Sequence, residues 1–389
     1  MLSFYIILFV TFCVLSYGVY EFQKHQKFVY QIPNRIHING TRGKSSVTRL
    51  IGAGLREAKI NAITKVTGTF PRLILGNGQE AKIRRKEGAN ILEQLNIVEF
   101  CAKNNAEAML IECMALQPQY QKITENQMIH ATIGVITNIR LDHLDVMGPG
   151  IREVGEALSN TIPTNGILFT SENKHHKFLE SKCNKKNTTF HQSNADSISN
   201  ADMQGFKYIE HKENVALALD ICNHLGVERE LALKGMKRMH PDEGVLARNT
   251  IITNNKQIDF YNAFAANDPE SSLMIWNNIL ATVTNDQMIV LLTVRKDRQS
   301  RAMQLITLIA TKLEYDYVVL IGEANNLIEE KAYALGIDKS KLINKPWDTP
   351  EKVFNGLIEL TDKKSTIVGI GNMGAMGAEV SQIFKDKQI

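Results

Sequence analysis

The sequence predicts an α/β fold of two domains that follow an apolar N-terminal segment. Short apolar runs alternate with amphipathic segments through most of the chain, and a glycine-rich loop joins one such run to a helix. The alternation begins again after a turn-rich stretch, and 389 residues are enough for two or three domains. We therefore divide the chain into an anchor (1–22), a larger domain (28–244) and a smaller, doubly wound domain (245–389).

The composition excludes several classes of protein. A formal net charge of +4 is too small, in a chain of this length, to indicate nucleic-acid binding, and we expect no nucleic-acid partner. The five cysteines form no C-x-x-C pair, so neither a zinc site nor a disulfide framework is indicated. Scattered cysteines of this kind are typical of a reducing compartment.

The N-terminal segment is apolar enough to form a membrane anchor. No charged residue occurs from Leu2 to Tyr20, and a run of that length can span a bilayer as a helix. Lys24, His25 and Lys27 follow directly, so the positive-inside rule places the rest of the chain in the cytoplasm. A cleaved signal peptide would need a basic n-region and an A-x-A-like site, which the sequence lacks. A buried core helix is the other alternative.

The glycine-rich loop predicts a phosphate-binding site. It lies between a predicted strand, Arg35–Ile38, and a helix whose apolar residues begin at Val47. Its pattern is G-x-x-G-K-S, whereas the usual P-loop would need a glycine in place of Ile38. Backbone N–H groups and the helix N-terminus would bind phosphates, with Lys44 on the outer phosphates and Ser45 on Mg²⁺. The alternative is a chance glycine turn. We assign phosphate binding to Gly40, Thr41, Arg42, Gly43, Lys44, Ser45 and Ser46.

Two further side chains follow predicted strands of the first domain. Glu112 ends the apolar run 108–113, and His143 follows the run 131–138. The carboxyl ends of parallel strands meet at one edge of a sheet, where ligands bind. Ser45, Glu112 and His143 could therefore hold Mg²⁺ beside a nucleotide, although a solvated carboxylate and a histidine without function are open alternatives.

The remaining segments are assigned more simply. Residues 171–202 are polar and rich in Lys, Asn and Ser, which predicts surface loops. In the second domain, runs at 288–293, 317–322 and 365–371 predict further strands. Asp297-Arg298 follows the first of them and could place a cation at the ligand crevice, or form an ordinary surface ion pair.

Taken together, the motifs resemble the Mur ligase superfamily, which includes the folylpolyglutamate synthases. The similarity rests on the loop and on the motifs that come after it in order, and it covers nearly everything after the anchor. The membrane segment that leads straight into the loop is most similar to one branch, the ligase subunit of bacterial poly-γ-glutamate synthases. The motifs are G-T-R-G-K-S, Ile111-Glu112-Cys113, Asp142-His143-Leu144-Asp145, Asn214 in Glu-Asn-Val-Ala-Leu-Ala, Asn267-Asp268-Pro269 and Asp297-Arg298.

The resemblance implies both a fold and a reaction. The fold would be a P-loop, Mur-ligase-like central domain and a smaller Rossmann-like C-terminal domain behind one transmembrane helix. ATP would phosphorylate a terminal carboxylate, and the amine of an incoming amino acid would attack the acyl phosphate. The resemblance gives catalytic roles to Lys44, His143 and Arg298, Mg²⁺ binding to Ser45, Glu112 and His143, and ATP binding to the loop, Asn214, Asp297 and Arg298.

The sequence departs from the family at two points. Mur ligases carry a carbamylated lysine about a dozen residues beyond the His-Leu-Asp segment, where this chain has Ala157 and where Glu156 is only a speculative replacement. Few residues separate the anchor from the loop, so the UDP-sugar domain of peptidoglycan ligases is missing.

We therefore expect a membrane-anchored, ATP- and Mg²⁺-dependent ligase of a bacterial inner or plasma membrane that extends polyglutamate through γ-carboxyls. Its expected partners are glutamate, the growing polyglutamate chain and other membrane subunits of a synthesis and export complex, and a homo-oligomer is expected. The alternatives are a folylpolyglutamate-synthase-like glutamate ligase and a P-loop ATPase subunit that energises a transporter. The sequence leaves open the stereochemistry of the amino acid and the primer.

Overall fold

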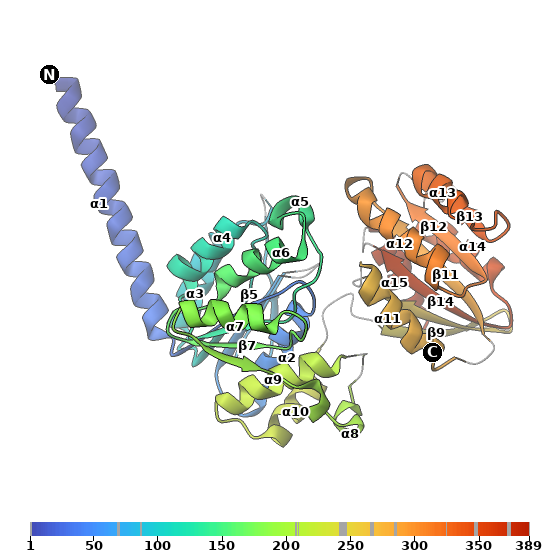
Figure 1. Cartoon of the computed structure of the whole chain (residues 1–389), viewed down its shortest axis with the longest axis horizontal. Coiled ribbons are helices and arrows are strands. Elements are labelled where there is room, and N and C mark those ends of the chain that lie inside the picture. Colours follow the sequence, from blue (N-terminus) through green and yellow to red (C-terminus); the bar gives the residue numbers. More distant parts are fainter. Residues whose placement is uncertain are drawn as a thin grey trace. The chain divides into compact units, whose positions relative to one another are not determined.

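The computed structural model divides the chain into two compact units, Met1–Asp242 and Glu243–Ile389 (Figure 1). The residues that the structure describes are 2–67, 71–85, 88–206, 208, 210–240, 247–264, 268–283, 286–323, 325–345, 349–371 and 375–388.

The first unit begins with α1 (Leu2–Gln31), a single continuous helix of 30 residues (Figure 1). By length and composition, its stretch Ser3–Gln31 could cross a membrane. The apolar side chains of its first five turns are exposed, with Phe9 at 66%, so the alternative of a buried core helix is wrong for this part. The end of the helix is different, because Val29 is fully buried in the first unit.

A mostly parallel sheet of eight strands, counted among the described residues, forms the centre of the first unit. The strand order is β4-β3-β2-β5-β1-β6-β7-β8, and among these strands only β3 runs in the opposite direction, antiparallel to both β2 and β4. The strands are β1 (Asn34–Asn39), β2 (Ala62–Val66), β3 (Arg72–Ile74), β4 (Glu80–Lys82), β5 (Ala108–Glu112), β6 (Ile133–Ile136), β7 (Ile167–Thr170) and β8 (Thr189–Gln192).

The register brings the ends of three strands to one edge of this sheet. Ile38 of β1 lies opposite Glu112 of β5, and Asn39 lies opposite Ile136 of β6. The segments that leave β1, β5 and β6 therefore start at the same edge, as the sequence predicted for parallel strands.

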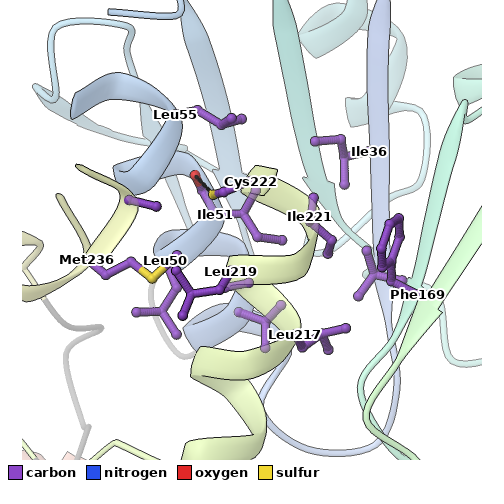
Figure 2. Packing of buried hydrophobic residues seen from close by; sticks show 14 of the residues in the cluster. Ile36, Leu50, Ile51, Leu55, Phe169, Leu217, Leu219, Ile221, Cys222 and Met236 are labelled. Atoms are coloured by element: carbon purple, nitrogen blue, oxygen red, sulfur yellow. Dashed lines mark hydrogen bonds between the residues drawn. The ribbon is translucent and has the colours of Figure 1, made fainter. Parts of the chain in front are cut away.

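Helices cover both faces of the sheet. One face packs against α2, α9 and α10, where Leu50, Leu219 and Met236 interlock (Figure 2), and each such side chain stabilises the fold by about 1.5–3 kcal/mol through burial. The other face packs against α1 and α3. The helices of this unit after α1 are α2 (Lys44–Glu57), α3 (Glu93–Lys103), α4 (Pro118–Ile123), the π-helix η1 (Thr124–Ile129), α5 (Leu144–Met147), α6 (Ile151–Leu158), η2 (Ser159–Thr161), α7 (His176–Lys185), η3 (Ala195–Ser197), α8 (Asn200–Met203), α9 (Lys212–His224) and α10 (Arg229–Arg238).

The expectation of loops over 171–202 is wrong. This segment contains α7, the edge strand β8 and α8. The strand β8 pairs with β7 on one side only and is largely exposed. An exposed edge strand needs no alternation of apolar residues, so its polar sequence concealed it.

The second unit is built on a six-stranded sheet of order β13-β12-β11-β14-β10-β9, in which only β9 is antiparallel. Helices lie on both faces, with α11, α12 and α13 over one apolar cluster and α14 and α15 over the other. Its elements are β9 (Ala247–Thr253), β10 (Lys256–Asn262), α11 (Pro269–Leu280), β11 (Gln287–Val294), η4 (Lys296–Arg298), α12 (Gln299–Lys312), β12 (Tyr317–Gly322), α13 (Asn325–Ala334), β13 (Leu342–Asn344), α14 (Pro350–Leu360), β14 (Lys364–Gly371) and α15 (Ala375–Asp386).

Candidate active site

The loop between β1 and α2 depends on two glycines. Gly40 and Gly43 have φ of +129° and +79°, which other residues rarely adopt. A Cβ at Gly40 would lie 2.0 Å from Thr137 Oγ1, and one at Gly43 would lie 2.8 Å from Asn214 Oδ1. The loop is therefore pressed against the end of β6 on one side and the start of α9 on the other.

Side chains from the end of β6 hold the loop in this shape. Asn138 Oδ1 accepts hydrogen bonds from Thr41 Oγ1 at 2.7 Å and from Arg42 N at 3.0 Å. Thr137 Oγ1 donates to the Arg42 carbonyl at 2.6 Å. The loop is thus fixed before any ligand arrives, which lowers the entropic cost of binding a phosphate chain.

The ammonium of Lys44 lies inside the loop. Its Nζ donates to the carbonyls of Gly40 at 2.7 Å and Thr41 at 3.3 Å. Burial lowers the pKa of Lys44, and the negative charge of Glu112 partly opposes that shift. An anion that enters the loop would meet this ammonium together with the N-terminus of α2.

Ser45 and Glu112 are brought into contact. Ser45 Oγ lies 3.0 Å from each carboxylate oxygen of Glu112, and Thr67 N donates to Glu112 Oε2 at 2.6 Å. The Glu112 side chain is buried, at 2% exposure. The Ser45 hydroxyl at the start of α2 and the Glu112 carboxylate at the end of β5 are oxygen donors of the kind that Mg²⁺ prefers, and this ion usually keeps several waters.

His143 is connected to the loop through Asp142. It has a left-handed conformation (φ +48°) immediately before α5, and its Nε2 lies 3.7 Å from Asp142 Oδ2. The same oxygen lies 3.3 Å from Nη2 of Arg42. In the described part of the chain, no group of three or more His, Cys, Asp or Glu is placed to hold a metal ion. Besides the oxygen atoms of Ser45 and Glu112, any Mg²⁺ here would need oxygen atoms from water and nucleotide.

A buried carboxylate that sequence reasoning missed lies on the other side of the loop. Glu210 accepts hydrogen bonds from Ser46 Oγ at 2.5 Å, Asn214 Nδ2 at 2.8 Å and His211 N at 2.8 Å. It therefore joins the start of α2 to the start of α9 and holds Asn214 against Gly43. The only signal in the sequence is an acid four residues before Asn214.

Asp297 and Arg298 belong to the second unit. They lie in η4, where Asp297 accepts two hydrogen bonds from Arg295, at 2.9 and 2.8 Å. The hydrogen bond from Arg295 lowers the pKa of Asp297. The Nε of Arg298 lies 4.0 Å from Asp297 Oδ2, and its side chain is 40% exposed. Asp297 and Arg298 therefore form the surface ion pair that was the alternative interpretation of the sequence, and the Arg298 guanidinium remains accessible.

The remaining positions named from the sequence belong to α6 and to the start of α11. Glu156, the speculative replacement for the carbamylated lysine, is an exposed residue of α6 that pairs with Lys182 of α7. Ala157 beside it is buried, at 1% exposure. Asn267 lies outside the described residues, whereas Asp268 caps α11 by accepting from Ser271 N at 3.0 Å.

Comparison with known proteins identifies the family. Residues 38–239 match the Mur ligase middle domain, and residues 249–387 match the poly-gamma-glutamate synthase CapB C-terminal domain. The chain is 37% identical over 389 residues to the capsule biosynthesis protein CapB of Bacillus anthracis, which covers 99% of this chain and 83% of that protein. It belongs to the CapB family of Mur ligases. The resemblance predicted from the motifs is confirmed.

A second CapB relative covers both chains almost completely. The PGA synthase CapB of Bacillus subtilis (strain 168) is 35% identical over 383 residues, or 97% of each chain. The glycine loop, the second unit and the segments between them therefore all lie within the region that the CapB family shares.

Solved structures confirm the Mur-ligase-like α/β fold. E. coli FolC in complex with DHPP and ADP has a TM-score of 0.70 at 12% identity, over 94% of this chain and 92% of that one. Folylpolyglutamate synthase from Thermotoga maritima has a TM-score of 0.63 at 14% identity, over 97% and 98%. MurF from Acinetobacter baumannii has a TM-score of 0.62 at 16% identity, over 95% and 79%. At these sequence identities, the similarity to the three solved structures shows a shared fold and nothing further.

Proposed function

We propose that this chain is an ATP-dependent amide ligase that extends poly-γ-glutamate. The observation that carries the proposal is the loop between β1 and α2, where Lys44 lies inside the turn and Ser45 contacts the buried Glu112. Membership of the CapB family supports it, and so does the name of the Bacillus subtilis relative, a PGA synthase. The ADP bound in E. coli FolC supports a nucleotide in this fold.

The reaction forms an amide in two steps. The terminal γ-carboxylate of the polymer attacks the γ-phosphorus of ATP, the bond to the ADP oxygen breaks, and an acyl phosphate forms. The amine of the incoming glutamate then attacks the acyl carbon, phosphate leaves with the bonding electrons, and the nitrogen loses a proton. Phosphoryl transfer of this kind depends on positioning and charge stabilisation more than on covalent help from the protein.

The first unit supplies most of the proposed site. Lys44 neutralises charge on the transferring phosphoryl group, since its ammonium already lies in the loop. Ser45, Glu112 and His143 hold Mg²⁺, which would screen the phosphate charges when bound. Asn214 contacts ATP beside Gly43. Asp297 and Arg298 are part of the same proposal as ATP-binding residues, and so is a Rossmann-like fold for the C-terminal domain that contains them.

The proposal extends to the setting of the enzyme. The apolar helix α1 supports a single N-terminal membrane pass, with residues 28–244 and 245–389 as cytoplasmic ligase domains. An anchor of this kind would keep the acidic product near membrane subunits that export it. A homo-oligomer is part of the same proposal.

Lys44→Ala tests the assignment directly. Membranes that contain the protein should release ADP in a glutamate-dependent manner, and this variant should lose at least about a hundredfold of that rate, because it removes the charge at the developing anion. Lys185→Ala, an exposed lysine of α7, is the matched control. Full polymer synthesis by Lys44→Ala would contradict the proposal.

The same membranes separate the rival functions. Incubation with ATP, Mg²⁺ and each candidate amino acid or pterin conjugate should show which acceptor drives ADP release and enters the product. A folylpolyglutamate-type ligase would need the pterin conjugate. A transport ATPase would release ADP without forming any amide.

A further inference from the structure

A cavity of about 680 Å³ lies along α2 in the first unit, and the loop residues Gly40–Ser46 are not among its lining. Its walls are α2, the turn into β2, the β3–β4 turn and the end of α10. Its charged side chains comprise four cations and two carboxylates, which are Arg49, Arg56, Lys59, Arg238, Glu57 and Glu80.

Both carboxylates are already engaged. Glu80 accepts from Arg49 at 2.6 and 3.3 Å. Glu57 lies 2.8 Å from Lys234 Nζ and 3.1 Å from Arg238 Nη1. Neither acid is in direct contact with the two remaining cations, Arg56 and Lys59, although Glu80 and Glu57 act on their charges from a longer distance.

Arg56 is fixed in place without a carboxylate. Its Nη1 donates to the carbonyl of Ala62 at 3.2 Å and to Thr64 Oγ1 at 3.1 Å, and both acceptors are neutral. Gly52 makes room for it, because a Cβ there would lie 2.9 Å from Arg56 Nη1. Burial and the nearby charge of Arg49 lower the pKa of Arg56 to about 10. An arriving anion would relieve this cost by favouring the charged guanidinium.

Lys59 adds a second cation at the end of the same helix. It is exposed, has a left-handed φ of +66°, and forms no ion pair within the described part of the chain. From Arg49 to Glu57, the last residue of α2, the helix axis rises by about 12 Å, and Lys59 follows two residues later. That length exceeds a single small anion and suits a chain that carries a carboxylate on every residue, which arginine binds well through its paired N–H groups.

We propose that this cavity binds the growing polyglutamate chain behind its reacting end, with Arg56 and Lys59 contacting its carboxylates. The inference rests on the proposed function. Arg49, where the cavity begins, lies five residues after Lys44, or about 7.5 Å along α2. A polymer held there stays close to the phosphate loop between successive additions.

The test is binding of an oligo-γ-glutamate of defined length to the full chain in detergent without ATP, measured by calorimetry. Lys59→Asn removes a charge at a position whose left-handed backbone suits Asn. We expect it to weaken binding about threefold, as for an exposed ion pair, and Arg56→Gln to weaken it about tenfold, as for a charge-assisted hydrogen bond. Lys185→Asn, exposed on α7, should bind as the wild type does. Arg56→Lys is the variant that keeps the positive charge, and thermal melting shows whether both Arg56 variants are folded.

Two results would overturn the inference. One is equal affinity in Lys59→Asn, Arg56→Gln and Lys185→Asn. The other is a wild type that binds the oligomer no more tightly than free glutamate at the same carboxylate concentration. If the wild type still releases ADP with glutamate, either result excludes the polymer-binding site and leaves the proposed function intact. Absence of glutamate-dependent ADP release in the wild type would instead contradict the proposed function.

Discussion

Glu112 is the residue on which the proposed metal site depends most. Both of its oxygens lie near Ser45 Oγ, and Oε2 also accepts from Thr67 N, so the carboxylate is fixed at the end of β5. We expect Glu112→Ala to raise the Mg²⁺ concentration needed for half-maximal ADP release at least about tenfold, or to abolish turnover, since a hard cation loses its anionic oxygen ligand. The measurement is a Mg²⁺ titration of glutamate-dependent ADP release.

The Glu112 variant also leaves Thr67 N without its acceptor, which costs about 1–3 kcal/mol. Ser45→Ala therefore serves as a second variant that keeps this hydrogen bond and still removes an oxygen donor. If both variants titrate with Mg²⁺ as the wild type does, Glu112 and Ser45 do not bind the metal.

Substitution of Glu210 should change the KM for ATP and not the Mg²⁺ requirement. It holds Ser46 and Asn214 against the loop and is itself buried, at 8% exposure. Glu210→Gln replaces one acceptor oxygen by a donor, so we expect the KM for ATP to rise about tenfold while the KM for glutamate stays unchanged. Glu213→Gln, an exposed acid three residues further on, is the control. A rise in both KM values would indicate a general loss of structure instead.

At this scale the sequence indicated which side chains lie together within one motif and at strand ends. Lys44 and Ser45 were predicted from the spacing of the loop, and Glu112 from its place at the end of an apolar run. The contact between Ser46 and Glu210 joins residues 164 positions apart. No local pattern indicates such a pair, because it exists only once α9 packs beside α2.

Among the elements, the π-helix η1 has a clear electrostatic role. It places Glu125 over β1, where Glu125 Oε2 lies 2.7 Å from His37 Nδ1 and Oε1 accepts from Ala131 N at 2.9 Å. Burial alone would lower the pKa of His37, but the neighbouring Cys113 and Glu125 raise it to about 9. The imidazolium is thus stabilised in the folded protein.

This pair predicts a loss of stability at high pH. The folded-state pKa is above the unfolded value of about 6.5, so the stabilisation is complete below pH 6.5 and disappears as the pH rises through about 9. We expect the free energy of unfolding of the first unit to fall by about 3 kcal/mol over that range. Calorimetry of the full chain at several pH values measures this. Glu125→Gln should flatten the dependence, and an unchanged slope in that variant would exclude the pair as its cause.

Element prediction succeeded where apolar runs are continuous and failed where they are not. The strands β1, β5 and β6 were all recognised because each is buried on both faces. The β3–β4 hairpin and β8 were missed, since they are short or lie at an exposed edge. The π-helix η1 has only six residues, too few for a period to show in the sequence, so it could not be predicted.

For the whole molecule, the N-terminal helix combines two environments in one element. Its first five turns expose apolar side chains such as Phe12 at 68%, which water does not favour and a bilayer does. Its last turns belong to the first unit, because Val29 is buried and His25 Nε2 lies 2.8 Å from the Met128 carbonyl. The apolar N-terminal segment and the first unit are therefore joined by continuous helix.

This arrangement predicts that the exposed part of α1 can be deleted without loss of the fold, whereas the buried part cannot. Deletion of residues 2–20 should move the protein into the soluble fraction with ADP release intact, because the contacts of His25 and Val29 remain. Deletion of residues 2–32 should also remove Val29 and Ile32 from the core, at a cost of about 2–5 kcal/mol for each buried side chain, and give an unfolded or inactive protein. Fractionation and thermal melting of the two proteins measure both effects. Persistent membrane association after the shorter deletion would mean that another surface or a partner holds the protein, since no other helix among the described residues is long and apolar enough to span a bilayer.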